Sequence, residues 1–475
     1  MLTITPRTMV LTRRTIFFVF LSLYVILCPL LILTTFGYII NPIKQEVTQT
    51  GLIFLSSLPS GADIYLEKSH YRNRSPANLS GLLPGTYKIT LKKKGYKPWV
   101  QSISVAAGKA ATFNQIILIP KVWPAQRLAA GPFSKMEPLA GTNYILLAEH
   151  PFLGQYCVFD WKNKLLAPLL PARSRFADWP VSEIFSEQSS PVVIFQSASF
   201  WKNKYLYVDL GQTPFRILEI TRLIKEKPTA WCWNSLYPKK LLLSTRDAAG
   251  LLDVETGAAE VKWLTGLKGC GSQGKWLYIL DGRDDVYRES FDGAHREFLF
   301  PKPRWEGRSA AAANPERITW IANDIFLFST VSGSLTTNVP PYVLLDGGLA
   351  GFRYDHKTER LLFWTKKDIG FAELTRRVRL KTERAVSSKI FKVHKVWDQG
   401  QAITDCFWAA GGTHLVFQDH SAIYLLEFVP TGKPRTEKIT EVKAASSIFY
   451  TEEGKAIYFL NPKDGALTAL SLIPE

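Results

Sequence analysis

An uninterrupted apolar stretch lies near the start of the chain. Residues 16–40 read IFFVFLSLYVILCPLLILTTFGYII and contain no charged side chain. About 20 apolar residues suffice for a helix to cross a bilayer, and membrane helices tolerate a proline such as Pro29. No amphipathic period interrupts the stretch, which argues against the core helix of a soluble domain. The pattern therefore predicts a transmembrane helix.

The charges on either side of this stretch predict its orientation. Arg7, Arg13 and Arg14 precede it with no acidic residue among them, whereas Lys44 and Glu46 roughly cancel each other after it. By the positive-inside rule, the N-terminus stays in the cytoplasm and the remainder of the chain is exported.

Two other interpretations of the apolar stretch stay open. A cleaved signal peptide has an apolar core of about 7 to 15 residues and a cleavage site of small residues. This stretch is longer, and Thr35-Phe36-Gly37 matches such a site poorly. Cys28 could instead carry a lipid, but Leu27 before it is bulky and the apolar run continues well past it. A single-pass anchor is the expected form.

Short alternating runs follow in residues 50–119. Asp63–Leu66 and Tyr87–Leu91 place apolar and polar side chains at alternate positions, as half-buried strands do. Proline and glycine separate the runs, because proline fixes one φ of a turn and glycine permits a positive one. Five or six such strands in about 70 residues predict a small antiparallel β-sandwich.

The same region resembles a PEGA domain over essentially its full length. Its segments SSLPSGADIYLE, SPANLSGLLPGTYKITLKKKGYKPW and SISVAAGK follow the order of that family. The positions that match the family's turns and core are Pro59, Ser60, Gly61, Ala62, Pro84, Gly85, Gly95 and Tyr96. Only Ser60 departs from the Pro-Glu-Gly-Ala tetrapeptide, and proline and glycine set that turn. The resemblance implies an extracellular spacer or adhesion module without catalytic residues.

One pattern recurs beyond residue 121. Four positions after an aromatic residue comes a glycine or a polar residue, and an apolar run starts three positions after that. The copies begin at Trp408, Tyr450 and Tyr354, shortened copies begin at Gly274 and Gly141, and weaker ones lie at Leu241, Val192 and Ile318. Eight units of roughly 43 residues suit the four-stranded blades of a β-propeller, which commonly take about 40 to 50 residues.

A ring of such blades would give each hairpin a buried partner face. The repeat resembles TolB-like and WD40-like propellers, and the blade number is expected to be six to eight. The resemblance implies binding at one ring face or in the central channel, but a fold alone does not identify the residues that bind.

Composition narrows the classes of function. Hydrophobic residues make up 46% of the chain, which excludes wholesale disorder. The formal charge is +17, yet the basic residues are scattered, with the densest runs at Lys92–Lys94 and Arg376–Lys381. Neither run has the interleaved aromatic residues or the fold signature of a nucleic-acid site, so nucleic acid is not expected as a partner. Attraction to an anionic membrane or wall polymer is expected instead.

The cysteines are widely spaced, at Cys28, Cys157, Cys232, Cys270 and Cys406. No CxxC or Cys/His cluster indicates zinc or a redox pair. The four outside the apolar stretch could pair in an oxidising compartment or serve as small core residues, and the sequence leaves this open.

No motif indicates catalysis, a cofactor or a metal. Gly269–Gly274 fits the GxGxxG spacing but precedes the strand-like Trp276–Leu280 rather than a helix, so a glycine-rich turn between blades is expected. Asp281–Asp285 lacks the spacing of a calcium loop and predicts a hairpin turn. No GxSxG nucleophile elbow is present.

The sequence thus predicts an all-β envelope protein. Its expected parts are a cytoplasmic stub at 1–15, an anchor at 16–40, a PEGA sandwich at 50–119 and a propeller at 121–475. The expected function is extracytoplasmic binding of a protein or a cell-wall polysaccharide, without enzymatic activity. The alternatives are a propeller-type hydrolase or lyase acting on an extracellular glycan, and a structural component of an envelope assembly.

Overall fold

A computed structural model describes most of the chain, and its contacts divide the chain into two compact units. The described residues are 6–40, 47–139, 141–171, 173–187, 190–197, 203–233, 236–246, 248–263, 267–302, 316–322, 325–381, 384–428, 434–444 and 446–473. The first unit comprises residues 1–123, 427–435 and 473–475, and the second comprises residues 124–426 and 436–472.

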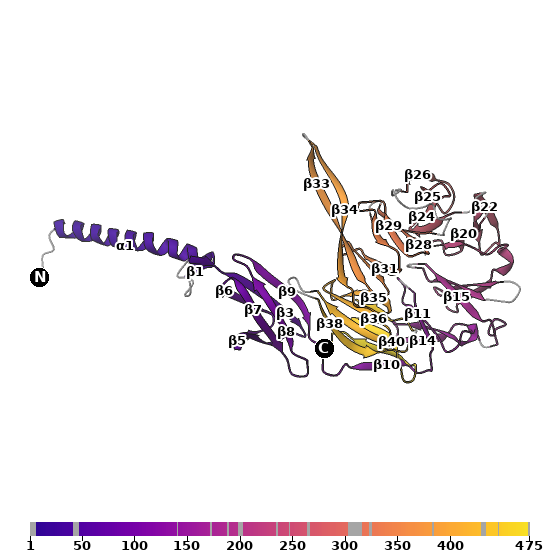
Figure 1. Ribbon diagram of the computed structural model, residues 1–475, viewed down its shortest axis with the longest axis horizontal. Coiled ribbons are helices and arrows are strands. Elements are labelled where there is room, and N and C mark those ends of the chain that lie inside the picture. The colour runs from indigo at the N-terminus through magenta and orange to yellow at the C-terminus, as the bar shows by residue number, and fades with distance from the viewer. Residues whose placement is uncertain are drawn as a thin grey trace. The chain divides into compact units, whose positions relative to one another are not determined.

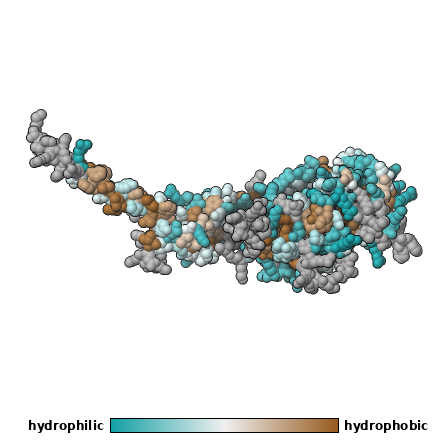
Figure 2. Space-filling model, turned by 90° about the horizontal axis from the view of Figure 1, so that it is seen from above, coloured by the Kyte–Doolittle hydropathy of each residue, from teal (hydrophilic) through white to brown (hydrophobic). Residues whose placement is uncertain are grey.

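The first unit begins with helix α1 (Pro6–Thr35). Its segment Thr15–Thr35 has a mean hydropathy of 2.9, and the rest of the chain buries none of it. Figure 2 shows the hydrophobic side chains gathered along this helix. The segment is long and apolar enough to cross a bilayer, a property that an anchor shares with a signal sequence.

Helix α1 ends earlier than the predicted anchor. Gly37 adopts a positive φ of 76°, and residues that were expected to be helical form strand β1 (Tyr38–Ile40), which pairs with β2 (Val47–Gln49). The predicted end at Ile40 is therefore wrong, because a glycine turn follows Thr35 and stops the helix.

Seven strands form the sandwich that follows. They are β3 (Gly51–Leu58), β4 (Asp63–Leu66), β5 (Ser69–Arg74), β6 (Ala77–Leu82), β7 (Gly85–Lys92), β8 (Trp99–Val105) and β9 (Ala110–Ile117). One sheet has the order β6-β3-β9 and the other β5-β4-β7-β8. Strand β7 alternates over Tyr87–Leu91 as its sequence pattern predicts, with Ile89 and Leu91 buried and Lys88 exposed. The β3–β9 pair is parallel, so the prediction of a wholly antiparallel sandwich is wrong at this pair.

The second unit is built from groups of four neighbouring antiparallel strands. Within the described residues there are eight such groups, here called blades 1 to 8 in chain order. Blade 1 contains β11 (Lys135–Pro138), β12 (Tyr144–Ala148), β13 (Tyr156–Asp160) and β14 (Leu165–Pro168); blade 2 contains β15 (Val181–Ser186), β16 (Val192–Ser197), β17 (Lys204–Asp209) and β18 (Arg216–Glu219); blade 3 contains β19 (Ala230–Cys232), β20 (Lys240–Ser244), β21 (Ala249–Asp253) and β22 (Ala259–Trp263).

The remaining blades follow the same plan. Blade 4 contains β23 (Gly269–Gln273), β24 (Trp276–Leu280), β25 (Asp285–Ser290) and β26 (Arg296–Pro301); blade 5 contains β27 (Glu316–Ala322), β28 (Ile325–Thr330), β29 (Ser334–Thr337) and β30 (Val343–Asp346); blade 6 contains β31 (Leu349–Asp355), β32 (Arg360–Thr365), β33 (Ile369–Lys381) and β34 (Arg384–Trp397); blade 7 contains β35 (Ile403–Ala409), β36 (His414–Asp419), β37 (Ala422–Glu427) and β38 (Arg435–Glu441); blade 8 contains β39 (Phe449–Thr451), β40 (Ala456–Leu460) and β41 (Leu467–Ser471).

Blade 8 obtains its fourth strand from the start of the unit. Strand β10 (Ala125–Ala129) pairs with β41, and Ala125 lies opposite Leu470. Apolar clusters join neighbouring blades, with Leu146 and Val193 in the cluster of blades 1 and 2. Another cluster joins Ile145 of blade 1 to Leu460 of blade 8. The unit is a closed β-propeller, as the sequence repeat predicts.

The recurrent sequence pattern marks the turn between the first and second strands of a blade. Gly412, with a φ of 83°, lies between β35 and β36, and Gly454 lies between β39 and β40. The weak copy at Ile318 was placed one strand too early, because Ile318 lies in the first strand of blade 5 and the second strand is β28.

The glycine-rich segment of blade 4 also differs from its prediction. Gly269–Gln273 is the first strand, β23, rather than a turn between blades. It pairs in parallel with β27 of blade 5, and a Cβ on Gly271 would lie 1.9 Å from the Ile318 carbonyl oxygen. Glycine therefore permits the close approach of two innermost strands. The predicted hairpin turn at Asp281 is confirmed, since its Oδ1 accepts the Asp285 N–H at 2.9 Å.

Blade 6 ends in a long hairpin. Strands β33 and β34 contain 13 and 14 residues. Strand β32 pairs with Ile369–Glu373, and beyond that point β33 continues as a two-stranded ribbon with β34 (Figure 1). The backbone of the basic run Arg376–Lys381 lies in this ribbon.

Candidate binding site

A disulfide joins the first strands of blades 3 and 4. Cys232, at the end of β19, pairs with Cys270 of β23, 38 positions later in the sequence. Both cysteines are buried. The sequence left the state of these cysteines open, and the structure pairs these two while Cys28, Cys157 and Cys406 have free thiols.

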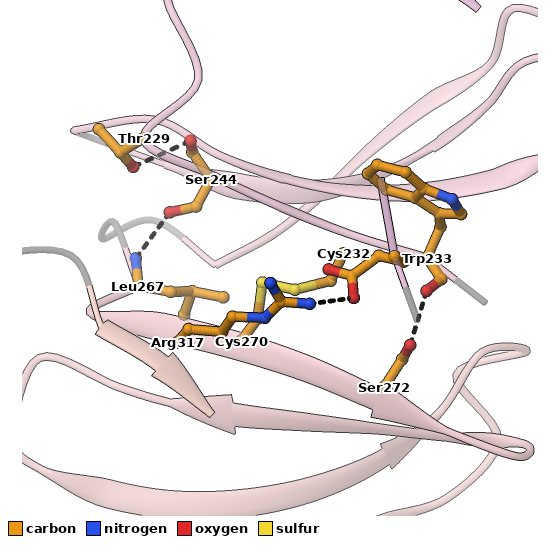
Figure 3. Close-up of a disulfide and its surroundings, with 9 residues drawn as sticks. Thr229, Cys232, Trp233, Ser244, Leu267, Cys270, Ser272 and Arg317 are labelled. Carbon is orange, nitrogen blue, oxygen red and sulfur yellow. Dashed lines mark hydrogen bonds and ion pairs between the residues drawn. A yellow bond between two sulfur atoms is a disulfide. The ribbon is translucent and has the colours of Figure 1, made fainter. Parts of the chain in front are cut away.

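Hydrogen bonds hold the chain around this disulfide (Figure 3). The Thr229 hydroxyl donates to the Ser244 carbonyl at 3.0 Å, and the Ser244 hydroxyl accepts the Leu267 N–H at 3.0 Å. The Ser272 hydroxyl donates to the Trp233 carbonyl at 2.6 Å. The segments before and after both cysteines are therefore tied to each other independently of the S–S bond.

A pocket of about 490 Å³ opens beside the disulfide. It lies within the range of about 300–1,000 Å³ that is typical of small-molecule sites. Blades 2 to 5 contribute its lining, which consists of Ile184, Phe185, Ser186, Glu187, Thr229, Ala230, Trp231, Trp233, Cys270, Arg317, Ser329, Thr330 and Val331. Its aromatic side is well packed, since the rings of Phe185 and Trp231 lie 5.6 Å apart.

One ion pair gives the pocket a polar side. Arg317 of β27 lies 2.8 Å from the Glu187 carboxylate, which follows β15. The Glu187 side chain is 13% exposed, whereas the Arg317 side chain is 52% exposed. The acid is thus largely covered while the guanidinium remains open to solvent and can donate to an incoming acceptor. The arrangement suits a ligand with an apolar part beside a polar or anionic group.

A second polar centre lies on the first strands of blades 6 and 7. Arg353 Nε donates to the Cys406 carbonyl at 3.0 Å, and its guanidinium lies 3.8 Å from the Asp405 carboxylate. Asp405 also accepts the Ile448 N–H at 3.2 Å. Burial raises the pKa of Asp405, and Arg353 opposes that shift. These groups satisfy one another and bridge three blades, so the centre is a structural link.

The described part of the chain offers no group of three or more His, Cys, Asp or Glu side chains placed to hold a metal ion. Burial lowers the pKa of His414 to about 3, so this histidine stays neutral at ordinary pH. The lining of the disulfide pocket offers hydrogen bonding, ion pairing and apolar contact.

The predicted sandwich positions belong to the first unit, whereas the disulfide pocket belongs to the second. Leu58 and Pro59 join through a cis peptide bond, Ser60 is exposed, and Gly61 has a φ of 80°. Ala62 is fully buried in the sandwich core. Lys93 Nζ donates to the Ser60 carbonyl at 2.6 Å, so part of the basic run stabilises the turn.

The other predicted positions also have structural roles. Pro84 and Gly85 lead into β7. Gly95 has a φ of 87°, and Tyr96 packs on the sandwich core and forms an isolated bridge with Pro120. These residues set turns and fill the core, and none of them lines the disulfide pocket.

A profile of the PEGA domain family matches residues 50–117, which span the seven strands described above. Residues 50–117 form a PEGA domain. No curated protein matches the chain as a whole.

Several solved structures resemble the chain at low sequence identity. The β-propeller domain of Cps50 (Swd1) from Myceliophteria thermophila is 11% identical, covers 73% of this chain and 99% of its own, and has a TM-score of 0.36. BamB from Moraxella catarrhalis is 12% identical, with coverages of 73% and 98% and a TM-score of 0.40. The computationally designed protein Ika8 is 13% identical, with coverages of 74% and 98% and a TM-score of 0.40. The propeller assignment rests on the strand pairing of this chain itself.

Sequence reasoning named no residue of the disulfide pocket as a site residue. The first strands of blades 3 and 4 each contain one cysteine, in the short motifs Trp231-Cys232-Trp233 and Gly269-Cys270-Gly271. Aligning the blades strand by strand could have brought the two cysteines together. The Arg317–Glu187 pair joins blades 5 and 2, and no local pattern signals such a contact.

Proposed function

We propose that this chain is a membrane-anchored binding protein of the cell envelope, with a PEGA domain next to its anchor and a propeller that carries the ligand sites. The observation that carries the proposal is the PEGA match at residues 50–117 immediately after an apolar helix long enough to cross a bilayer. Extracytoplasmic domains commonly follow a single N-terminal anchor of this kind.

The disulfide supports an exported propeller. Disulfides persist in oxidising compartments and are rare in the cytosol. Cys232 and Cys270 are buried and paired within the propeller, whereas a cytosolic protein would keep them reduced. Three basic residues and no acidic residue precede the apolar segment. This charge distribution agrees with a cytoplasmic N-terminus and an exported propeller.

The disulfide pocket is the proposed recognition site of the propeller. Its aromatic wall and its exposed guanidinium suit a protein segment that presents an apolar side chain beside a carboxylate. Binding requires no cofactor and no chemical step, so the proposal describes a binding protein rather than an enzyme.

Protease protection tests the topology. The full chain is expressed with different epitope tags at its two ends, and intact cells or spheroplasts are treated with protease. The proposal predicts loss of the C-terminal tag and survival of the N-terminal tag, and a cytoplasmic protein serves as the leakage control. Protection of the C-terminal tag would overturn the exported topology. Loss of the N-terminal tag from the mature protein before protease treatment would replace the anchor with a cleaved signal.

A further inference from the structure

A second pocket lies between blades 6 and 7, apart from the disulfide. It has a volume of about 420 Å³ and draws its walls from the end of β34, the connection to β35, the β36–β37 turn, and strands β36, β37 and β38. The lining residues that carry the argument are Trp397, Gln399, Gln401, Phe417, Ser421 and Tyr424. All of these residues belong to the second unit.

Aromatic rings form one wall of this pocket. The rings of Phe417 and Tyr424 are stacked at 5.4 Å with an interplanar angle of 19°. Trp397 lies 6.0 Å from Phe417 and is tilted by 49°. Phe417 is buried, while Trp397 and Tyr424 remain partly exposed. Flat, rigid and partly exposed rings offer an apolar surface at little cost in conformational entropy.

Neutral polar groups also line the pocket. The side-chain amides of Gln399 and Gln401 and the hydroxyl of Ser421 line the pocket and make no hydrogen bond to the residues that the structure describes. An amide offers two donors and an acceptor, and a hydroxyl offers both roles. These groups can therefore bind a ligand that is itself both donor and acceptor.

The charged groups of the lining are already engaged. The Asp419 carboxylate accepts the N–H groups of Gln401 and Ala402, the latter at 2.7 Å. Lys438 Nζ donates to Glu441 at 2.9 Å. Asp419 and Lys438 carry opposite charges, so together they give the lining no net charge that would attract an ion of one sign. The pocket thus favours an uncharged ligand.

We infer that the pocket between blades 6 and 7 binds a neutral saccharide. A pyranose ring has an apolar face of C–H groups that packs on Trp397 or Tyr424, and a rim of hydroxyls, each donor and acceptor, that meets the amides of Gln399 and Gln401. The volume lies within the range of small-ligand sites, so a short oligosaccharide segment fits rather than a folded partner.

The test uses the full chain in a detergent without a sugar headgroup. Maltotetraose, cellotetraose and tetra-N-acetylchitotetraose are titrated, and intrinsic tryptophan fluorescence and calorimetry report binding. At least one probe is expected to bind saturably. Tyr424→Ala is expected to weaken that binding about tenfold and Gln401→Ala about fivefold, because each removes one contact worth about 1 kcal/mol. Tyr424→Phe keeps the ring and is expected to retain most of the affinity.

Matched variants outside the pocket control for nonspecific effects. Phe298→Ala removes a half-exposed ring from blade 4 and Gln126→Ala removes an exposed amide from β10, and neither is expected to alter binding. Absence of saturable binding by all three probes would overturn the inference. Equal affinity in Tyr424→Ala and wild type, with melting temperatures unchanged, would also overturn it, as would binding of an anionic polysaccharide or a peptide at this pocket in place of the neutral probes.

This inference uses the proposed binding function for its biological setting only. If the chain is exported but binds none of the probes, the saccharide site is refuted and the proposed topology stands. If the chain binds the probes but its C-terminus is protected in the cytoplasm, the saccharide site stands and the proposed location is refuted.

Discussion

Replacing both cysteines of the disulfide tests whether the bond is formed and what it contributes. The double variant Cys232→Ala/Cys270→Ala removes the covalent link between blades 3 and 4 without leaving a reactive thiol in the pocket. The cysteines are 38 positions apart. Closing a loop of that length lowers the entropy of the unfolded chain enough to stabilise the folded state by about 4 kcal/mol.

That free energy converts into a moderate change in melting temperature. The propeller unit has about 340 residues, and unfolding at about 2.1 cal/mol/K per residue gives an entropy near 0.7 kcal/mol/K. Loss of about 4 kcal/mol should then lower the melting temperature by about 5 °C. The hydrogen bonds of Thr229, Ser244 and Ser272 around the bond stay in place, so the blades are expected to remain folded at lower temperatures.

The assay follows thermal unfolding of the full chain with and without dithiothreitol. Wild type is expected to melt about 5 °C lower in reductant, while the double variant melts at the lower temperature in both conditions. Alkylation of unfolded, unreduced protein should modify the three free cysteines, and alkylation after reduction should modify all five. Five modified cysteines before reduction, in protein isolated without reductant, would refute the pairing. A reductant-insensitive melting temperature in protein with three modified cysteines would refute the loop-entropy estimate.

Three further predictions concern groups inside the propeller. His414 has a folded-state pKa of about 3 because it is buried. As pH falls below about 6.5, this histidine is protonated in the unfolded chain but not in the folded one, so the free energy of unfolding should fall by about 2 kcal/mol between pH 7 and pH 5. Melting of the His414→Asn variant, measured as a function of pH, should lack this loss. Arg353→Met leaves the Asp405 carboxylate without its cation and should lower the free energy of unfolding by about 2 kcal/mol, less than for a fully buried pair because the Arg353 side chain is a third exposed. Adding Asp405→Asn should restore part of this stability in a double-mutant cycle. Strictly additive effects of the two substitutions would contradict the coupling. Gly271→Ala places a methyl group against the Ile318 carbonyl and should lower the free energy of unfolding in urea by about 2 kcal/mol or more. An unchanged free energy of unfolding would show that β23 and β27 are not in close contact.

The sequence predicts the architecture well wherever local patterns decide it. Strand β7 has the alternation that its sequence predicts over Tyr87–Leu91. The aromatic-to-glycine pattern finds the turns at Gly412 and Gly454 because each blade repeats the same hairpin. The helix end was missed because hydropathy measures polarity, whereas a positive φ at Gly37 decides where α1 stops. The glycine-rich segment at Gly269 was missed because its glycines serve a contact with a strand from another blade.

The candidate sites were beyond the reach of a single sequence for a related reason. The disulfide pocket draws on four blades and the second pocket on two. The residues within each pocket are spread along the chain and share no spacing, so ring closure brings them together. The PEGA motif positions, by contrast, are local in sequence: Gly61 and Gly95 have a positive φ, and Ala62 lies in the sandwich core.

The pairing of β10 with β41 has a consequence for how the protein is made. Ala125 finds its partner Leu470 only after nearly the whole propeller has been synthesised. Contacts between residues so far apart in sequence form slowly because a long loop must close first. Until then β10 is an unpaired strand, and such an edge invites pairing with a neighbouring chain. Ring closure within one chain thus competes with association between chains, and a chaperone that covers β10 would favour ring closure.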